Sequence, residues 1–349
     1  MERDCPLSTA ARMNAPRTLV CVLAETRSWK TTWPSFKMNV LDRLGADLAL
    51  CIGAHETYDR SNPFWQSARY RWTSIEYGDY GEAFDAAQSR LIADGRRPAW
   101  RELLDIRNQW LGGIRGHGQH PGSAAILIYF RWLLLECLRS SGALQRYDRF
   151  VITRSDFVWL SPHPGLDVLT PDSIWLPDGE NYGGLTDRHA VLTRDDVELY
   201  LDLMTPIVCE TDALFSRMEG RTDWNLEAYI KQHLSKAGAL TRLKLFPYIM
   251  YSVREKDGST RWSKGIWNNW LQYYIKYPSE YAAATFWQLA RPFFRDDPEL
   301  LHWINGGGRL SACFETFLGR RQWLLARLAR GNTATPSALL GQTETFCHI

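Results

Sequence analysis

The feature that most constrains the fold is the run of residues 147–160, in which a strand-forming stretch ends on polar residues. Residues 150–153 are aromatic or β-branched and predict a buried strand, which stops at Arg154, Ser155 and Asp156 before apolar residues resume. In open α/β sheets the ligand crevice lies beyond the carboxyl ends of the strands, so Asp156 is expected to face a site. The alternative is a structural aspartate that caps a turn.

The chain before this strand predicts a βαβ unit. Residues 18–24 form an apolar run typical of a buried strand, a helix is expected to follow through residue 44, and residues 47–52 predict a second strand. That order implies a parallel pair whose carboxyl ends share one edge of an α/β sheet. Further strands are expected at 72–76, 174–177 and 243–253, and further helices at 82–94, 100–110, 123–140, 194–203, 206–218 and 224–237.

Composition limits the classes of function. The 41 Lys and Arg residues nearly balance 39 Asp and Glu residues, which argues against a protein that coats nucleic acid. The seven cysteines include no CxxC pair, as expected of a reduced compartment. The most apolar stretch, residues 124–138, contains Arg131 and is shorter than the ~20 residues of a membrane-spanning helix. Because the first sixteen residues also lack an apolar signal segment, a cytoplasmic protein is expected.

A polar loop follows the strand expected at 174–177. Residues 178–189 combine Asp, Glu, Asn, Tyr, Gly and His before the apolar residues 190–192. Turns also collect Gly, Asn and Asp, but the density of polar and aromatic side chains here favours a site over a plain connection. Asp187 and His189 are the candidate functional residues of this loop.

Several short motifs occur in an order that resembles GT-A glycosyltransferases. They are Pro-Gly-Ser at 121–123, Tyr-Asp-Arg-Phe-Val-Ile-Thr-Arg-Ser-Asp at 147–156, Trp-Leu-Pro-Asp-Gly-Glu at 175–180 and Gly-Gly-Leu-Thr-Asp-Arg-His at 183–189. The similar enzymes build bacterial capsular or O-antigen polysaccharides, and related ones glycosylate chlorovirus capsids. The resemblance covers residues 18–253.

The resemblance implies a fold and a chemistry. It implies a Rossmann-like mixed sheet flanked by helices, a nucleotide-sugar donor, Mn²⁺ or Mg²⁺, and transfer of the sugar to a hydroxyl of a glycan or lipid-linked glycan. Where these enzymes commonly carry Asp-x-Asp, this chain has Arg154-Ser155-Asp156 and retains only the second acid.

Donor-binding roles follow for two loops. Asp156 would bind the metal beside the diphosphate, and Arg154 would pair with phosphate or orient Asp156. The alternative for these two residues is a buried ion pair that ends the strand. Ser155 belongs to the same donor-binding loop. Thr26 and Arg27 are the candidates for contacts to the donor base and ribose, unless they only form a helix entry.

Catalytic roles are expected for carboxylates further along the chain. An inverting transferase needs a carboxylate base within hydrogen-bond reach of the acceptor hydroxyl. Asp187 is the first candidate for this base and Glu227 is the second. His189 either completes the metal shell or is a hydrogen-bonded core histidine.

The domain interpretation has three parts. Residues 1–16 are expected to be a flexible lead-in, residues 17–258 the GT-A catalytic domain, and residues 259–349 a helical extension rich in Trp, Arg and Phe, with a helix at 314–330. Three roles are open for the extension. It packs back on the catalytic domain, lies against an anionic membrane surface, or forms a homodimer interface.

Two other classes of function compete with the transferase. A metal-dependent phosphate or nucleotide hydrolase would also use Asp156, but the sequence contains no GxxxxGK[ST] motif. A non-enzymatic carbohydrate-binding protein would use the sixteen tryptophans as stacking surfaces, although tryptophans also fill cores.

Overall fold

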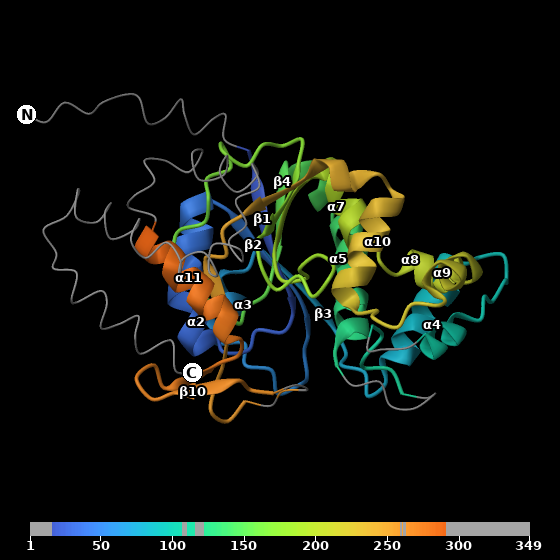
Figure 1. The fold of residues 1–349 in the computed structure, drawn as a ribbon, viewed down its shortest axis with the longest axis horizontal. Coiled ribbons are helices and arrows are strands. Elements are labelled where there is room, and N and C mark those ends of the chain that lie inside the picture. The colour runs from blue at the N-terminus through green and yellow to red at the C-terminus, as the bar shows by residue number, and fades with distance from the viewer. Residues whose placement is uncertain (1–15, 107–109, 116–121, 259, 261–262, 291–349) are drawn as a thin grey trace, which may run out of the picture.

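The centre of the molecule is a seven-stranded mixed sheet (Figure 1). The computed structural model describes residues 16–106, 110–115, 122–258, 260 and 263–290. Across the sheet the strands are β3 (Tyr70–Ser74), β2 (Asp47–Gly53), β1 (Thr18–Ala24), β4 (Arg149–Thr153), β7 (Ala190–Thr193), β6 (Ile174–Pro177) and β8 (Leu243–Phe246). The α/β class expected from the sequence, a mixed sheet flanked by helices, is confirmed.

The three central parallel strands, β2, β1 and β4, are almost entirely buried. In β1, Val20 lies opposite Leu48 of β2 on one side and Val151 of β4 on the other, and all three are fully buried. A strand that is covered on both faces has a continuous run of apolar residues. This is why the sequence predicts strands at residues 18–24 and 47–52. Next to β4, β7 runs antiparallel and makes the sheet mixed.

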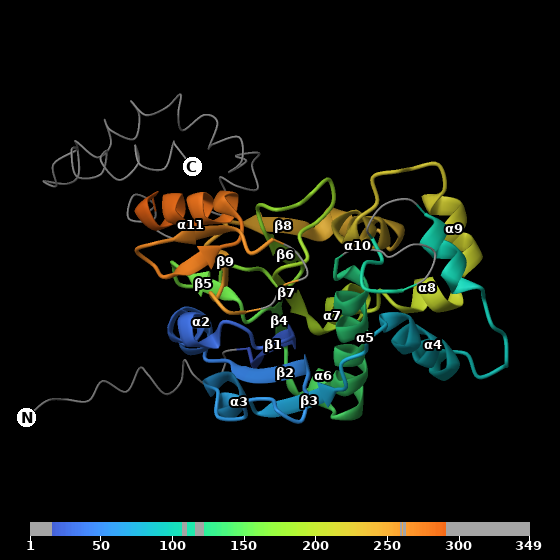
Figure 2. The ribbon, with the colours of Figure 1, turned by 90° about the horizontal axis from the view of Figure 1, so that it is seen from below.

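Helices and a second, smaller sheet cover the two faces of the large sheet (Figures 1 and 2). One face packs against α5 (Ala124–Ser140), with α7 (Arg194–Leu201) and α10 (Leu226–Lys236) beside it. The other face packs against α2 (Trp29–Phe36) and the second sheet. The remaining helices of the described residues are α3 (Pro63–Ser67), α4 (Tyr80–Leu91), α6 (Ala143–Arg146), α8 (Thr205–Cys209), α9 (Thr211–Met218) and α11 (Pro278–Ala290), with a π-helical segment at Lys37–Asp42 that continues α2 and two short 3₁₀ turns at Trp100–Asp105 and Ala239–Arg242.

The second sheet joins the chain beyond residue 258 to the region before it. Its order is β10 (Ile266–Asn268), β11 (Tyr273–Ile275), β9 (Met250–Arg254) and β5 (Phe157–Trp159), all paired antiparallel. After β11, α11 packs on β9. This part of the expected extension therefore contributes strands as well as a helix. The lead-in at residues 1–15 and the helix expected at 314–330 lie outside the described residues.

Three of the expected elements were wrong in detail. The strand expected at 243–253 is two strands in different sheets, because Pro247 cannot donate a ladder hydrogen bond and separates β8 from β9. The helix expected at 206–218 is two helices, since Glu210 leaves the helical backbone conformation. Of the helix expected at 100–110, the described residues form the 3₁₀ turn Trp100–Asp105, after which Ile106 is extended, and residues 107–109 lie outside the described residues.

Candidate functional site

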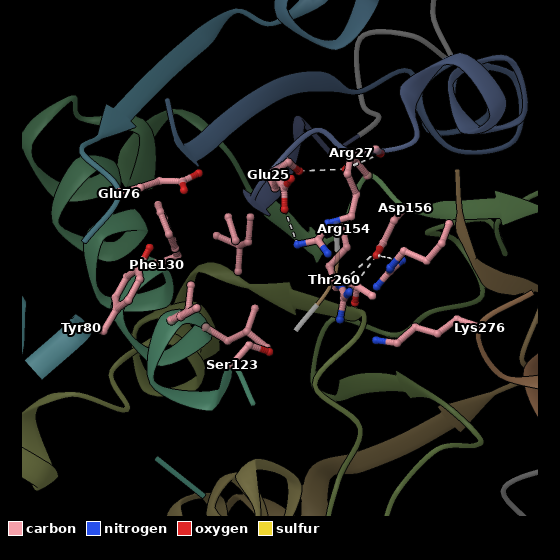
Figure 3. Close-up of a pocket in the computed structure, with 16 residues that line it drawn as sticks. Glu25, Arg27, Glu76, Tyr80, Ser123, Phe130, Arg154, Asp156, Thr260 and Lys276 are labelled. Atoms are coloured by element: carbon pink, nitrogen blue, oxygen red, sulfur yellow. Dashed lines mark hydrogen bonds and ion pairs between the residues drawn. The ribbon is translucent and has the colours of Figure 1, made fainter. Parts of the chain in front are cut away.

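A cavity of about 400 Å³ lies at the carboxyl ends of β1 and β4 (Figure 3). The chain leaves β1 towards β2 on one side, whereas β4 lies on the other side, so this is the point at which the order of strands reverses. Ligands of open α/β sheets bind at such switch points. The cavity is lined by Leu23, Ala24, Glu25, Arg27, Glu76, Tyr80, Ser123, Ile126, Leu127, Phe130, Arg154, Ser155, Asp156, Arg254, Thr260 and Lys276.

The loops after β1 and β4 are tied together below this cavity. At the end of β1, Ala24 adopts a left-handed backbone conformation with φ of 69°, which is uncommon for a residue other than glycine and turns the chain sharply. The hydroxyl of Ser155 lies 2.8 Å from the carbonyl oxygen of Glu25 and 3.2 Å from that of Arg27. Ser155 therefore fixes the two loops relative to each other.

Asp156 is the anionic centre of one end of the cavity. Its side chain is only 2% exposed, and its two oxygens accept hydrogen bonds from Nε of Arg154 at 3.1 Å and from Nη2 at 2.8 Å. Nη1 of Arg254 donates a further bond to Oδ2 at 2.5 Å. Burial acts to raise the pKa of Asp156, but the guanidinium groups of Arg154, Arg254 and Arg27 hold this pKa well below its usual value. Asp156 is therefore a permanently charged carboxylate that organises arginines.

These side chains do not fit a divalent cation. Mg²⁺ and Mn²⁺ need several oxygen ligands with free lone pairs, whereas the three guanidinium hydrogen bonds to Asp156 leave only about one of its four lone pairs for a metal. The three arginines near Asp156 would also repel a cation. Within the part of the chain that the structure describes, no group of three or more His, Cys, Asp or Glu side chains is placed to hold a metal ion.

The structure does not bring His189 to Asp156. His189 is 1% exposed and lies in the core, where its Nδ1 is 3.1 Å from Thr153 Oγ1 and its Nε2 is 3.1 Å from His163 Nε2. Its ring also packs against Trp159 and Phe246. Burial, with a smaller effect of His163, lowers the pKa of His189 well below the usual value, so the ring is neutral. Of the two roles weighed from the sequence, these contacts match the hydrogen-bonded core histidine.

Cations gather around Asp156 at the same end of the cavity. Lys276, which follows β11, points towards Arg154 and Asp156 in Figure 3, whereas Glu76 and Tyr80 lie at the other end. The Lys276 ammonium has no carboxylate partner among the described residues and lies 4.8 Å from the centre of the Tyr277 ring. Burial and the nearby cations Arg154 and Arg254 lower the pKa of Lys276 to about 7. This end of the cavity is thus suited to an anion.

Asp187 and Glu227 form a second acidic group, next to the cations. Glu227 lies in the first turn of α10, and its backbone carbonyl accepts a hydrogen bond from Leu185 N at 3.0 Å. Burial, and next the charge of Asp187, raise the pKa of Glu227 to about 7. Burial acts to lower the pKa of Arg154. Asp156 acts to raise this pKa, and Asp187 does so more weakly. The Asp187 and Glu227 carboxylates therefore interact with each other and with the positive end of the cavity.

A glycine allows this approach. A Cβ atom on Gly184 would lie 2.0 Å from the backbone carbon and oxygen of Glu227, so only glycine lets the loop of Asp187 reach the start of α10. The loop is held there by Asn225, which donates from Nδ2 to the carbonyl of Tyr182 at 2.9 Å. Gly184, the second residue of the Gly-Gly pair in the polar loop, is thus required for packing.

The sequence-based candidates separate into three groups in space. Arg27, Arg154, Ser155 and Asp156 line the cavity, whereas Asp187 and Glu227 lie outside its lining, near enough for the Asp187 charge to act on both Glu227 and Arg154. Thr26 does not line the cavity, because its hydroxyl is bonded to Tyr58 OH at 2.6 Å, and His189 lies in the core. The cavity lining also includes side chains that were not predicted from the sequence to be site residues.

Arg254 and Lys276 are the most important of these additional residues. Arg254 ends β9 and Lys276 follows β11, so both enter the site from the second sheet. Nothing in the local pattern marks either residue, because a basic side chain at a strand end is common. For Lys276 the only signal in the sequence is the high content of Trp, Arg and Phe beyond the expected catalytic domain, and Arg254, which lies inside that domain, has no such signal.

None of the helices in the described residues combines the length and apolar character needed to cross a lipid bilayer.

Comparison with known proteins gives no family for this chain, because no protein-family model matches it and no curated protein sequence matches it significantly.

Proposed function

We propose that the protein is a glycosyltransferase of the GT-A type, which moves a sugar from a nucleotide-sugar donor to a hydroxyl of a glycan or lipid-linked glycan in cell-surface polysaccharide synthesis. The observation that carries this proposal is a cation-lined cavity at the switch point between β1 and β4, with the Asp187 and Glu227 carboxylates beside its positive end. A nucleotide-sugar donor offers an anion to the first group, and a sugar acceptor offers a hydroxyl proton to the second.

The shape and charge of the cavity suggest an orientation for the donor. Its positive end, with Arg27, Arg154 and Lys276, suits the diphosphate. The opposite end is formed by Glu76 and the aromatic rings of Tyr80 and Phe130, with α5 as its floor. This end suits the nucleoside, whose ribose hydroxyls can donate hydrogen bonds to a carboxylate.

The carboxylate pair supports a role in acid–base chemistry. A general base works best when its pKa lies near the operating pH, and the pKa of Glu227 is raised to about 7. In the transfer, the bond from the anomeric carbon to the diphosphate oxygen breaks and its electron pair stays on the diphosphate. The acceptor oxygen bonds to the anomeric carbon, and the acceptor proton passes to the Asp187–Glu227 pair.

A transfer assay tests the proposed function. UDP-, GDP-, dTDP- and CMP-sugars are incubated with the full chain and a panel of simple glycosides, and products are detected by mass spectrometry. We expect one donor class to be consumed, with transfer reduced at least ~100-fold in Glu227→Gln and Asp187→Asn variants that keep their fold and donor binding. Release of sugar or phosphate without transfer to any glycoside would favour a hydrolase. A protein that binds glycans but no nucleotide would contradict the proposal.

A further inference from the structure

We propose that the protein's own cations, Arg154, Arg254 and Lys276, take the place of a divalent metal in binding the donor diphosphate and stabilising its charge as it leaves. This inference rests on the proposed transferase function and deepens it. It assigns Asp156 a different role from the metal ligand expected from the Asp-x-Asp resemblance, namely the counter-ion that positions two of the three cations.

The charge balance of the cavity supports this assignment. Glu25 pairs with Arg27, and Asp156 offsets one of the two guanidinium groups bonded to it. Once Arg154 is counted with Asp156, the Arg254 guanidinium and the protonated Lys276 ammonium have no further carboxylate at this end among the residues that line the cavity, and Asp187 lies outside this lining. A sugar diphosphate carries one negative charge on each of its two phosphates. The two surplus cations therefore match the diphosphate, and they equal in charge the divalent metal that they would replace.

The arginines also keep donors free for a ligand. Asp156 uses Nε and Nη2 of Arg154, so within the described residues Nη1 of this guanidinium has no protein partner. Arg254 is 2% exposed and lines the cavity, yet its buried Nε has no hydrogen-bond partner in the described part of the chain. A buried donor without a partner is costly, so Asp156 and the Val253 carbonyl alone do not fully satisfy the Arg254 guanidinium. Arginine is well suited to phosphate binding because its planar fork of donors matches the oxygens of phosphate.

The position of Arg154 explains why the first acid of the usual Asp-x-Asp triplet is absent. A carboxylate at 154 would serve a metal, whereas a guanidinium there repels one and binds the phosphate itself. Lys276, which follows β11, points into the same end of the cavity (Figure 3). During transfer the electron pair of the broken sugar–oxygen bond stays on the diphosphate, where these fixed positive charges stabilise it without a further reactant.

Calorimetric titration of the full chain tests the inference. UDP, GDP, dTDP, CMP and inorganic pyrophosphate are titrated at pH 7, once with a chelator and once with Mn²⁺. We expect one nucleoside diphosphate to bind with the same Kd within ~2-fold in both conditions, pyrophosphate to compete with it in chelator, and affinity to fall steeply with added salt. The Lys276→Met variant is expected to lose at least ~10-fold in affinity, and Lys276→Arg to retain most of it.

Lys264→Met is the matched control, because it removes the same charge from the chain just before β10 without touching the cavity lining. It is expected to bind as the unaltered protein does. Binding that appears only with Mn²⁺, or an unchanged affinity in a folded Lys276→Met variant, would overturn the metal-free site and leave the transferase intact. If Lys276→Met does not fold, Lys276→Arg and the chelator series decide the matter. The absence of nucleotide binding under both conditions would overturn the transferase and the inference together.

Discussion

Arg188 and Glu280 form a buried ion pair that joins the loop of Asp187 to helix α11. Nη1 of Arg188 lies 2.9 Å from Oε1 of Glu280, and the two side chains are 4% and 0% exposed. Glu280 also accepts hydrogen bonds from the backbone N–H of Ser252 at 2.6 Å and from Tyr248 OH at 3.0 Å. Arg188, which follows the candidate base Asp187, is thus held by α11, a helix that lies beyond the expected catalytic domain. The chain after residue 258 helps to build the site.

Removing the charge of Glu280 is expected to destabilise the protein. Glu280→Gln removes the nearer of the two carboxylates that pair with the buried Arg188 guanidinium and leaves only Glu180, at 3.9 Å, which costs about 3 kcal/mol. Urea unfolding measures the loss. The double variant Arg188→Met with Glu280→Leu removes both charges and is expected to recover much of the stability. A Glu280→Gln variant as stable as the unaltered chain would show that the pair does not anchor α11.

Asp156→Asn tests whether Asp156 organises arginines. Since two guanidinium groups share this carboxylate, its neutralisation is expected to lower the free energy of unfolding by about 3 kcal/mol and to weaken nucleotide binding in the presence of chelator. Denaturant unfolding and calorimetry on the same preparation give both values. Unchanged stability, combined with a loss of binding only in Mn²⁺, would instead identify Asp156 as a metal ligand.

The pH dependence of transfer is expected to report Glu227. Its pKa is raised from 4.5 to about 7 by burial and by Asp187, so the base is mostly protonated at pH 6 and mostly ionised at pH 8. At saturating donor, where the bound diphosphate keeps Lys276 protonated, kcat should therefore rise with pH through about 7 and then level off. In Glu227→Gln the rise is expected to disappear. A profile that is unchanged in this variant would exclude Glu227 as the titrating group.

The same shift makes a prediction about stability. Because the folded pKa of Glu227 is above the unfolded value of 4.5, its contribution to stability is fully present below pH 4.5 and is lost as the pH rises through about 7. Glu227→Gln, which is always neutral, should gain stability relative to the unaltered protein between pH 5 and pH 8. Thermal melting across this range checks the sign. A constant difference between the two proteins would contradict it.

Gly184→Ala is expected to separate the loop of Asp187 from α10. The added methyl would meet the Glu227 backbone at 2.0 Å, and relief of this clash needs a backbone shift that costs about 2 kcal/mol or more. The rate of transfer should fall by more than the loss of folded protein explains, because Asp187 moves away from Glu227. Gly78→Ala is the matched control, since nothing lies within 4 Å of its added methyl. Equal activity in the two variants would show that the approach of the loop is dispensable.

Trp270 offers a test of the membrane role considered for the chain after residue 258. Its side chain is 95% exposed in the connection between β10 and β11, and Leu271 beside it is 37% exposed. Trp270→Ser is therefore expected to change the free energy of unfolding by less than about 0.5 kcal/mol. Co-sedimentation with anionic vesicles should show weaker binding of the variant. Equal binding would exclude Trp270 as a membrane contact.

Local sequence determined the elements of the large sheet and the place of one site residue. The strands β1, β2 and β4 are buried on both faces, so each appears as an apolar run, and the polar residues that end β4 mark Asp156 without any knowledge of the fold. Pro247 was also visible as a strand breaker, although the expected strand at 243–253 ran through it.

Only the tertiary structure decided what surrounds Asp156. Arg254 is 98 residues away in the sequence and reaches Asp156 because β9 pairs with β5, and Lys276 arrives because β11 pairs with β9. Hydrophobic periodicity reports which face of an element is buried, but it carries no information on which distant strand becomes its neighbour. The acid at the strand end was therefore predictable, whereas its partners, and with them the change from an expected metal ligand to an arginine counter-ion, depend on long-range strand pairing.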